Sequence, residues 1–161
     1  MKPQAEQLKI LEGEERKDFI SKLDAEFGIK NVPGILIMRG KERIFLFSGN
    51  LDGKNLNDLE KIAFVERAGV YFAKVDEFGV RLSIEGTHVI GNEIKRNIVE
   101  LNSDEMETWM MGHELLKKTG LSGFVIIKYK DDFLGTGKAS AEKIANFIPK
   151  SRRLRDRNVE N

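Results

Sequence analysis

The chain has 161 residues, of which 40% are hydrophobic and 33% are charged, enough for one good domain or two small ones. Its formal net charge of +1 does not by itself indicate a polyanionic partner, and the absence of cysteine excludes disulfides, thiolate zinc sites and cysteine nucleophiles. No apolar stretch is long enough to span a bilayer, and the first residues are too polar for a secretory signal. We therefore expect a cytoplasmic protein with no membrane partner.

The first half of the chain predicts alternating short helices and strands. Residues 12–27 carry apolar side chains at helical spacing and are followed by Gly28, a typical helix end. Residues 35–48 predict a hairpin around a Gly-Lys turn, and residues 55–68 predict a second helix capped by an asparagine. Residues 70–86 predict another strand pair. Together these elements predict an α/β module that ends near residue 92.

The second half predicts a strand at 95–101, a helical stretch at 103–120 that ends at a glycine, and two apolar strands at 123–129 and 133–140. Trp109 and its neighbouring methionines have the spacing of a buried helix face, which favours a core role over a base-stacking platform. The change of pattern indicates a domain boundary between residues 92 and 93.

The second of these strands contains Gly135-Thr136-Gly137-Lys138, which resembles part of a phosphate-binding loop. The full pattern needs an earlier glycine and a hydroxyl after the lysine, but this chain has Asp132 and Ala139 at those places. We instead expect Gly135 and Gly137 to face the same side of a strand and to allow a neighbouring backbone or a ligand to approach closely.

The titratable residues offer little evidence of catalysis or of a metal site. We expect His88 at a strand end and His113 on the short helix, where each is more consistent with a structural role than with an acid–base pair. Asp131 and Asp132 are adjacent on a turn, which favours solvation over metal binding. The chain also lacks a glycine-rich fingerprint for a methyl donor, so we expect no cofactor. Residues 150–157 gather five basic side chains against one acid, which suits either a solvated terminus or an RNA contact.

The order of motifs in the second half resembles the PUA domain, a small RNA-binding β-barrel. The matching residues are Gly112, Leu115, Leu116 and Gly120, then residues 123–127, then Leu134, Gly135, Gly137, Lys138 and Ala139. Residues 11–15 with Phe19 and Leu23 resemble the opening helix of the Nip-seven family of ribosome-biogenesis factors. Residues 107–112 and 146–153 resemble the PUA-type tail of the NOL/NOP/Sun and RsmF RNA methyltransferases.

This resemblance implies an α+β protein in which an N-terminal α/β domain (residues 1–92) precedes a C-terminal PUA-type β-barrel (residues 93–161). It implies a factor that binds structured RNA without catalysis in rRNA or tRNA maturation. The alternative is a protein adaptor that docks on an RNA methyltransferase or a pre-ribosomal protein. The candidate RNA-binding residues are Lys117, Lys118, Lys138, Lys150, Arg152, Arg153 and Arg155.

Overall fold

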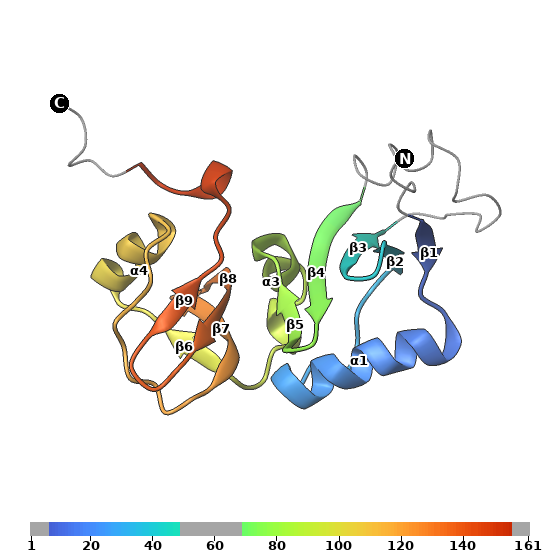
Figure 1. Cartoon of the computed structure of the whole chain (residues 1–161), viewed down its shortest axis with the longest axis horizontal. Helices are drawn as coiled ribbons and strands as arrows, with labels where there is room; N and C mark the ends of the chain where they lie inside the picture. The colour runs from blue at the N-terminus through green and yellow to red at the C-terminus, as the bar shows by residue number, and fades with distance from the viewer. Residues whose placement is uncertain (1–6, 49–68, 156–161) are drawn as a thin grey trace.

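The computed structural model of the chain describes residues 7–48 and 69–155, which form two sheets with three α-helices (Figure 1). The expected helix at 55–68 lies outside the described residues. The helices are α1 (Gly13–Phe27), α3 (Ile84–Val89) and α4 (Ser103–Met110), with 3₁₀ turns η1 (Gly91–Glu93) and η2 (Lys150–Arg152). The strands are β1 (Leu8–Ile10), β2 (Ile35–Arg39), β3 (Arg43–Phe47), β4 (Val70–Asp76), β5 (Gly79–Leu82), β6 (Ile98–Glu100), β7 (Gly123–Tyr129), β8 (Asp132–Ala139) and β9 (Ile144–Asn146).

The first sheet is an antiparallel array in the order β1-β2-β3-β4-β5, with α1 packed on one face. The hairpin between β2 and β3 confirms the expected turn, with Gly40 at a φ of 64°. Helix α1 also matches its prediction: it buries Phe19, Leu23 and Phe27 and ends at Gly28, whose φ of 71° is left-handed. The apolar face of α1 therefore covers the first sheet and forms one side of the core.

The prediction of a strand over residues 80–86 is wrong in its second part. Strand β5 ends at Leu82, and the chain then forms α3. The Ser83 side chain accepts a hydrogen bond from the Gly86 amide at 2.9 Å and so caps this helix. A side chain at Gly86 would collide with the carbonyl oxygen of Phe72, so the glycine lets α3 lie against β4. His88 consequently lies exposed on α3 and not at a strand end.

The second sheet has the order β6-β7-β8-β9, with β6 parallel to β7 and the other pairs antiparallel. The helix expected at 103–120 is shorter than predicted, because α4 ends at Met110 and Gly112 follows at a φ of 89°. Beyond it, Leu115 bridges to Ile144 and extends the sheet past β9. Among the described residues, the edge strands β6 and β9 of this sheet do not pair with each other, so closure into a barrel stays a prediction.

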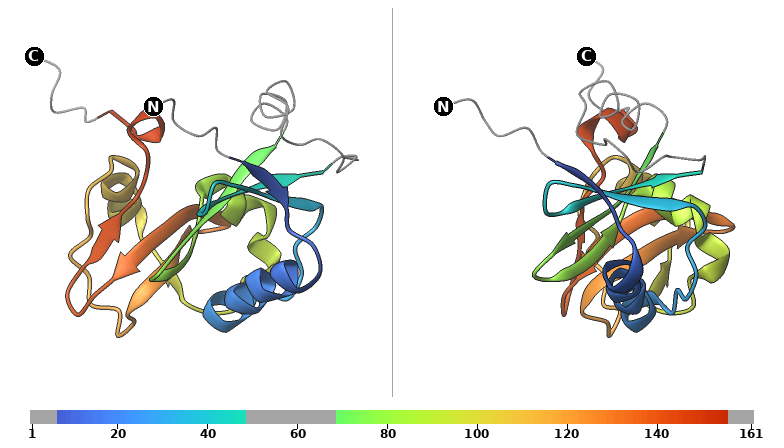
Figure 2. Two further views of the ribbon diagram at one scale, coloured as in Figure 1. Left: turned by 45° about the vertical axis from the view of Figure 1, so that its right-hand side comes forward. Right: turned by 90° about the vertical axis from the view of Figure 1, so that its right-hand side faces the viewer.

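Strands β7 and β8 lie between two apolar clusters. Phe124 and Ile126 on β7 belong to the cluster around α1 and the first sheet, whereas Val125 and Ile127 belong to the cluster around Trp109. This alternation is that of a strand buried on both faces. One face of the C-terminal sheet is thus covered by residues from the N-terminal half (Figure 2).

The two glycines of β8 are packed closely, as expected, but against protein groups. A side-chain Cβ on Gly137 would lie 2.5 Å from the Ile144 methyl and 2.8 Å from the Trp109 ring. At Gly135, with a φ of 84°, it would lie 3.1 Å from Ile84. The Trp109 indole is fully buried and donates to the Leu134 carbonyl at 3.1 Å, which confirms its core role. The Gly-x-Gly-Lys stretch is therefore a packed strand and not a phosphate loop.

Candidate nucleic-acid interface

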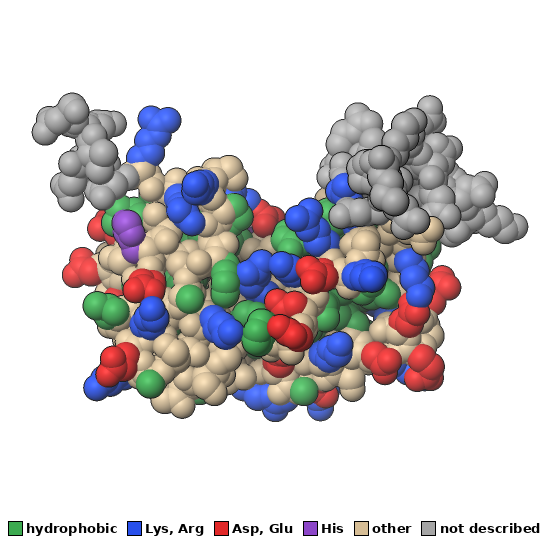
Figure 3. Space-filling view, viewed as in Figure 1, with side chains coloured by type: hydrophobic (Ala, Val, Ile, Leu, Met, Phe, Trp, Pro, Cys, Tyr) green, Lys and Arg blue, Asp and Glu red, His purple; other side chains and the backbone are tan. Residues whose placement is uncertain are grey.

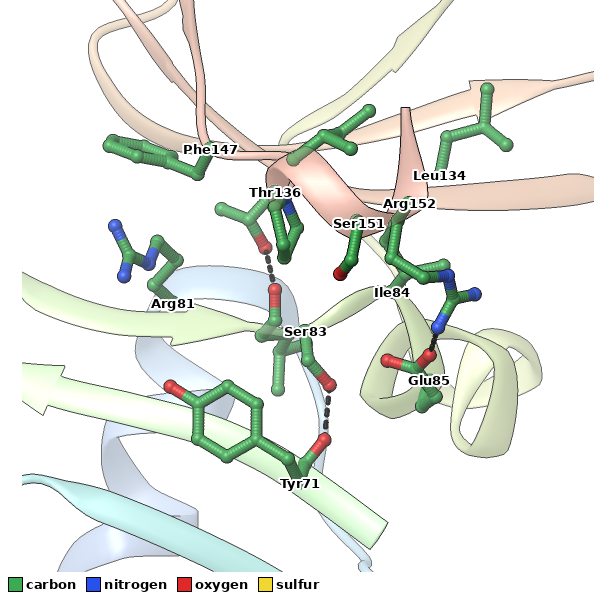
Figure 4. Close-up of a pocket in the computed structure, with 14 residues that line it drawn as sticks. Tyr71, Arg81, Ser83, Ile84, Glu85, Leu134, Thr136, Phe147, Ser151 and Arg152 are labelled. Carbon is green, nitrogen blue, oxygen red and sulfur yellow. Dashed lines mark hydrogen bonds and ion pairs between the residues drawn. The ribbon is translucent and has the colours of Figure 1, made fainter. Parts of the chain in front are cut away.

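A cavity of about 280 Å³ opens between the two halves of the chain, where the β5–α3 junction faces β8 and the segment after β9 (Figure 4). The side chains that line this cavity come from two separate parts of the sequence, residues 71–85 and 134–152, and only tertiary folding brings them together. The residues that shape its chemistry are Tyr71, Arg81, Ser83, Glu85, Phe147 and Arg152.

Arg81 and two aromatic rings form one end of this cavity. The guanidinium carbon of Arg81 lies 4.3 Å from the centroid of the Phe147 ring, a distance at which the ring face attracts a cation. Phe147 packs in turn edge-on against Phe124, with 6.1 Å between centroids. Burial raises the pKa of Tyr71, and the nearby Arg81 charge opposes that rise. Tyr71 therefore keeps its phenolic proton at neutral pH.

The other end is formed by α3 and η2. Arg152 makes an ion pair with Glu85, and both side chains are partly exposed at the rim. The Ser83 hydroxyl donates to the Tyr71 carbonyl, and the Thr136 hydroxyl donates to the Leu82 carbonyl at 2.8 Å. These bonds tie β5, β4 and β8 together, so the floor of the cavity is held by both sheets (Figure 4).

The basic segment at 150–155 is attached to the fold. The Leu154 amide donates to the Met110 carbonyl at 2.8 Å, and the Arg153 guanidinium donates to the Ile148 carbonyl at 2.9 Å. Arg153 also lies directly against Gly112, where a side chain would collide with it. Lys150 and Arg155 are exposed and make no ion pair with the described residues. Among the cations of this segment, these two are the ones whose side chains make no hydrogen bond or ion pair with the described residues.

Lys117 and Lys118 lie in a different place from the basic segment. Leu115 pairs antiparallel with Ile144, and Asn146 donates to the His113 carbonyl at 2.9 Å. The chain after Leu115 therefore runs away from residues 148–155. Lys117 makes an ion pair with Glu105 at 2.9 Å. Burial tends to raise the pKa of Glu105, but the Asn102 amide and Lys117 outweigh it, and the pKa is lowered.

Lys138 faces the N-terminal half of the chain. Its ammonium lies 4.1 Å from the ring centroid of Phe78, which is 64% exposed in the β4–β5 turn. The space-filling view shows Lys and Arg side chains over the middle of this face, with Asp and Glu side chains beside them (Figure 3). Some of the basic side chains therefore lie at the junction of the two halves, away from the C-terminal cluster that the sequence contains.

The histidines are not brought together. His88 lines a second cavity of about 230 Å³ with Asp131 and Asp132, whereas His113 lies in the loop after α4. Within residues 7–48 and 69–155, no group of three His, Asp or Glu side chains has metal-binding geometry. Nor does any helix of that part of the chain have the length and apolar character needed to cross a membrane.

Of the residues that shape the chemistry of the first cavity, the sequence analysis identified only Arg152 as a candidate site residue. Tyr71 and Arg81 occupy ordinary positions in a strand pattern and carry no local signal. Phe147 lies within the tail motif at 146–153, but nothing in that motif indicates that its ring meets an arginine from β5. Such a pairing depends on the contact between the two sheets.

The C-terminal half contains one mixed sheet, a short capped helix and a glycine-bearing strand, the kinds of element that the PUA resemblance predicts. Residues 96–154 match the family model described as the methyltransferase RsmF PUA domain. The wider chain resembles "Ribosomal RNA small subunit methyltransferase F" of Aeromonas salmonicida, with 29% identity over 153 residues. The Aeromonas hydrophila protein of that name is 27% identical over 150 residues, and the Vibrio atlanticus protein is 32% identical over 97 residues.

Both halves of the chain take part in this similarity. The match to the Aeromonas salmonicida protein covers 92% of this chain but only 30% of that protein, and the Vibrio atlanticus match covers 58% and 20%. The chain therefore spans about 30% of the length of the first of these relatives. The relatives support the methyltransferase branch of the resemblance, and the Nip-seven branch stays a prediction.

Proposed function

We propose that this chain is an RNA-binding unit that acts in ribosomal RNA methylation in the cytoplasm and does not itself transfer the methyl group. The match of residues 96–154 to the RsmF PUA domain carries this proposal. The absence of cysteine supports the second part, because enzymes that methylate cytosine at carbon 5 attack the base with a thiolate. The unit would place a structured RNA for a catalytic domain, whether that domain belongs to the same polypeptide or to a partner.

Phosphate contacts are the expected source of affinity. Lys150 and Arg155 are exposed and open, whereas Arg152 and Arg153 already have partners within the chain. Basic side chains that meet phosphates release counterions, so binding weakens steeply as salt rises. Lys117, Lys118 and Lys138 stay candidates, although the first is ion-paired and the third lies over an aromatic ring.

The salt dependence of RNA binding tests this proposal. We expect Lys150→Ala/Arg155→Ala to bind a structured RNA more weakly at every sequence tested and to flatten the salt slope by about two, one for each phosphate that is no longer neutralised. The matched control is Lys41→Ala/Arg43→Ala, two exposed cations at the β2–β3 turn, which should bind like the parent. Unchanged affinity and slope in the folded tail variant would contradict the phosphate role.

An exposed leucine favours the adaptor as the second candidate function. Leu116 is 84% exposed in the segment that extends the second sheet, where its side chain is accessible to a partner protein. If the chain docks on a methyltransferase through this segment, Leu116→Ser should abolish capture of that protein from nuclease-treated extract and leave RNA affinity unchanged. Loss of RNA affinity with capture intact would contradict the adaptor function.

A further inference from the structure

We propose that the cavity between the two sheets holds one unpaired nucleotide of the bound RNA. This inference rests on the proposed function and assigns a ligand to the cavity, which the basic segment borders through Ser151 and Arg152. The cavity lies at the junction of the two halves, and Arg152 on η2 reaches its rim. An RNA strand that contacts the basic segment would therefore pass beside it.

The charge of the cavity suits a nucleotide. Arg81 lies at one end and Arg152 at the other, with Glu85 as the acid paired to Arg152. The charged side chains that line the cavity therefore sum to one net positive charge. This charge belongs to Arg81, whose neighbours are the neutral Tyr71 and Phe147 side chains. A guanidinium in partly desolvated surroundings forms strong charge-assisted bonds to phosphate.

The remaining groups suit a base. Unpaired bases are recognised by stacking on aromatic rings or guanidinium planes and by hydrogen bonds to their edges. Here the Arg81–Phe147 pair offers a stacking surface, and the hydroxyls of Ser151 and Tyr71 offer donors and acceptors. Figure 4 shows the Ser151 hydroxyl directed from η2 toward the cavity.

The size of the cavity restricts the ligand to a small one. Its volume of about 280 Å³ is near the lower end of the range for small-molecule sites, which begins at roughly 300 Å³. A peptide helix or an RNA duplex is too large to enter. A single nucleotide that leaves its helix is the part of a structured RNA that such a space can admit.

The test compares two RNA hairpins, one with a single bulged 5-iodouridine and one fully paired. We expect the parent to bind the bulged RNA more tightly and, on irradiation, to crosslink to the peptides that carry Tyr71 or Phe147. Ser151→Trp should fill the cavity without removing charge and should weaken binding of the bulged RNA by about tenfold, a loss typical of one base stack. Arg81→Met should have the same effect and provides a second variant should the tryptophan disturb folding.

The control and the fully paired RNA separate this inference from the proposed function. Ser122→Trp places the same side chain at an exposed position before β7 and should bind both RNAs like the parent. Salt-dependent binding of both hairpins with equal affinity would overturn the nucleotide site and leave the proposed function standing. Binding of neither hairpin would overturn both. Crosslinks confined to peptides outside the cavity, or full bulge preference in folded Ser151→Trp and Arg81→Met, would also overturn the site.

Discussion

Gly137 shows how one residue links strand packing to the core around Trp109. Its missing side chain admits both the Ile144 methyl and the indole ring, so any added carbon must displace one of them. We expect Gly137→Ala to lower the free energy of unfolding by about 1–3 kcal/mol, as for other overpacked sites. Urea denaturation measures this value. Lys138→Ala, at the next position, removes only a cation–π contact with an exposed ring and should cost at most about 1 kcal/mol. Equal losses would contradict the packing explanation.

Glu26 links α1 to the β4–β5 turn and predicts a pH dependence. Its carboxylate accepts from the Val80 amide at 3.2 Å, yet burial raises its pKa above the ordinary value of 4.5, with repulsion from Asp76 as a smaller contribution. A carboxyl group whose pKa is raised in the folded state favours folding most when it is protonated, so stability falls as pH rises through the folded pKa.

Glu26→Gln should remove this fall, because the amide keeps an acceptor for Val80 without a charge. We expect the variant to melt at a higher temperature than the parent at pH 7 and at the same temperature below the ordinary pKa of 4.5. Thermal melts across this pH range measure the difference, with Glu77→Gln on the exposed turn as the control. A difference that stays constant with pH would contradict the titration of Glu26.

Helix α4 depends on its cap at the scale of the element. It has eight residues, too few to be stable alone, and its first turn is fixed by a capping box. The Asn102 side chain accepts from the Glu105 amide at 2.8 Å, and the Glu105 carboxylate accepts from the Asn102 amide at 3.0 Å. We expect Asn102→Ala to lower stability by about 1 kcal/mol in denaturant titration. Ser103→Ala is the neighbouring exposed control, and a similar loss there would contradict the cap.

The whole molecule is held together by a core that crosses the expected domain boundary. Phe124 and Ile126 lie in one cluster with Leu23, Phe27 and Phe72 from the other half. Exposing a large apolar side chain costs about 1.5–3 kcal/mol, a substantial share of the stability of a small domain. Independent folding of residues 93–161 stays a prediction, and a fragment of these residues would lose the stability that burial of Phe124 and Ile126 provides.

We expect the fragment 93–161 to keep a β-rich circular dichroism spectrum at low temperature. It should melt at least about 10 °C below the intact chain and bind a hydrophobic dye, because the face that carries Phe124 loses its cover. A random-coil spectrum would contradict independent folding. A melting temperature equal to that of the intact chain would contradict the shared core.

Local patterns in the sequence were sufficient to predict several elements. The apolar spacing of α1 with its terminal glycine, the β2–β3 hairpin and the burial of Trp109 depend on interactions close in sequence or on hydrophobic period alone. The PUA resemblance likewise depends on short motifs, and the match of residues 96–154 to the RsmF PUA domain model confirms it. Predictions failed where a few residues decided the outcome: Ser83 started a helix within an expected strand, and Gly112 ended a helix expected to continue.

The amino-acid sequence by itself determined the mixture of helices and strands, the absence of cysteine chemistry and the position of the basic residues along the chain. Only the tertiary structure decided which of those residues are open to a ligand. Arg152 meets Glu85, Lys117 meets Glu105, and Arg81 meets Phe147, because folding brings these partners from separate elements and loops within reach. Charge and hydrophobic period are properties of a linear pattern, whereas a cavity and its cations exist only where two sheets pack together.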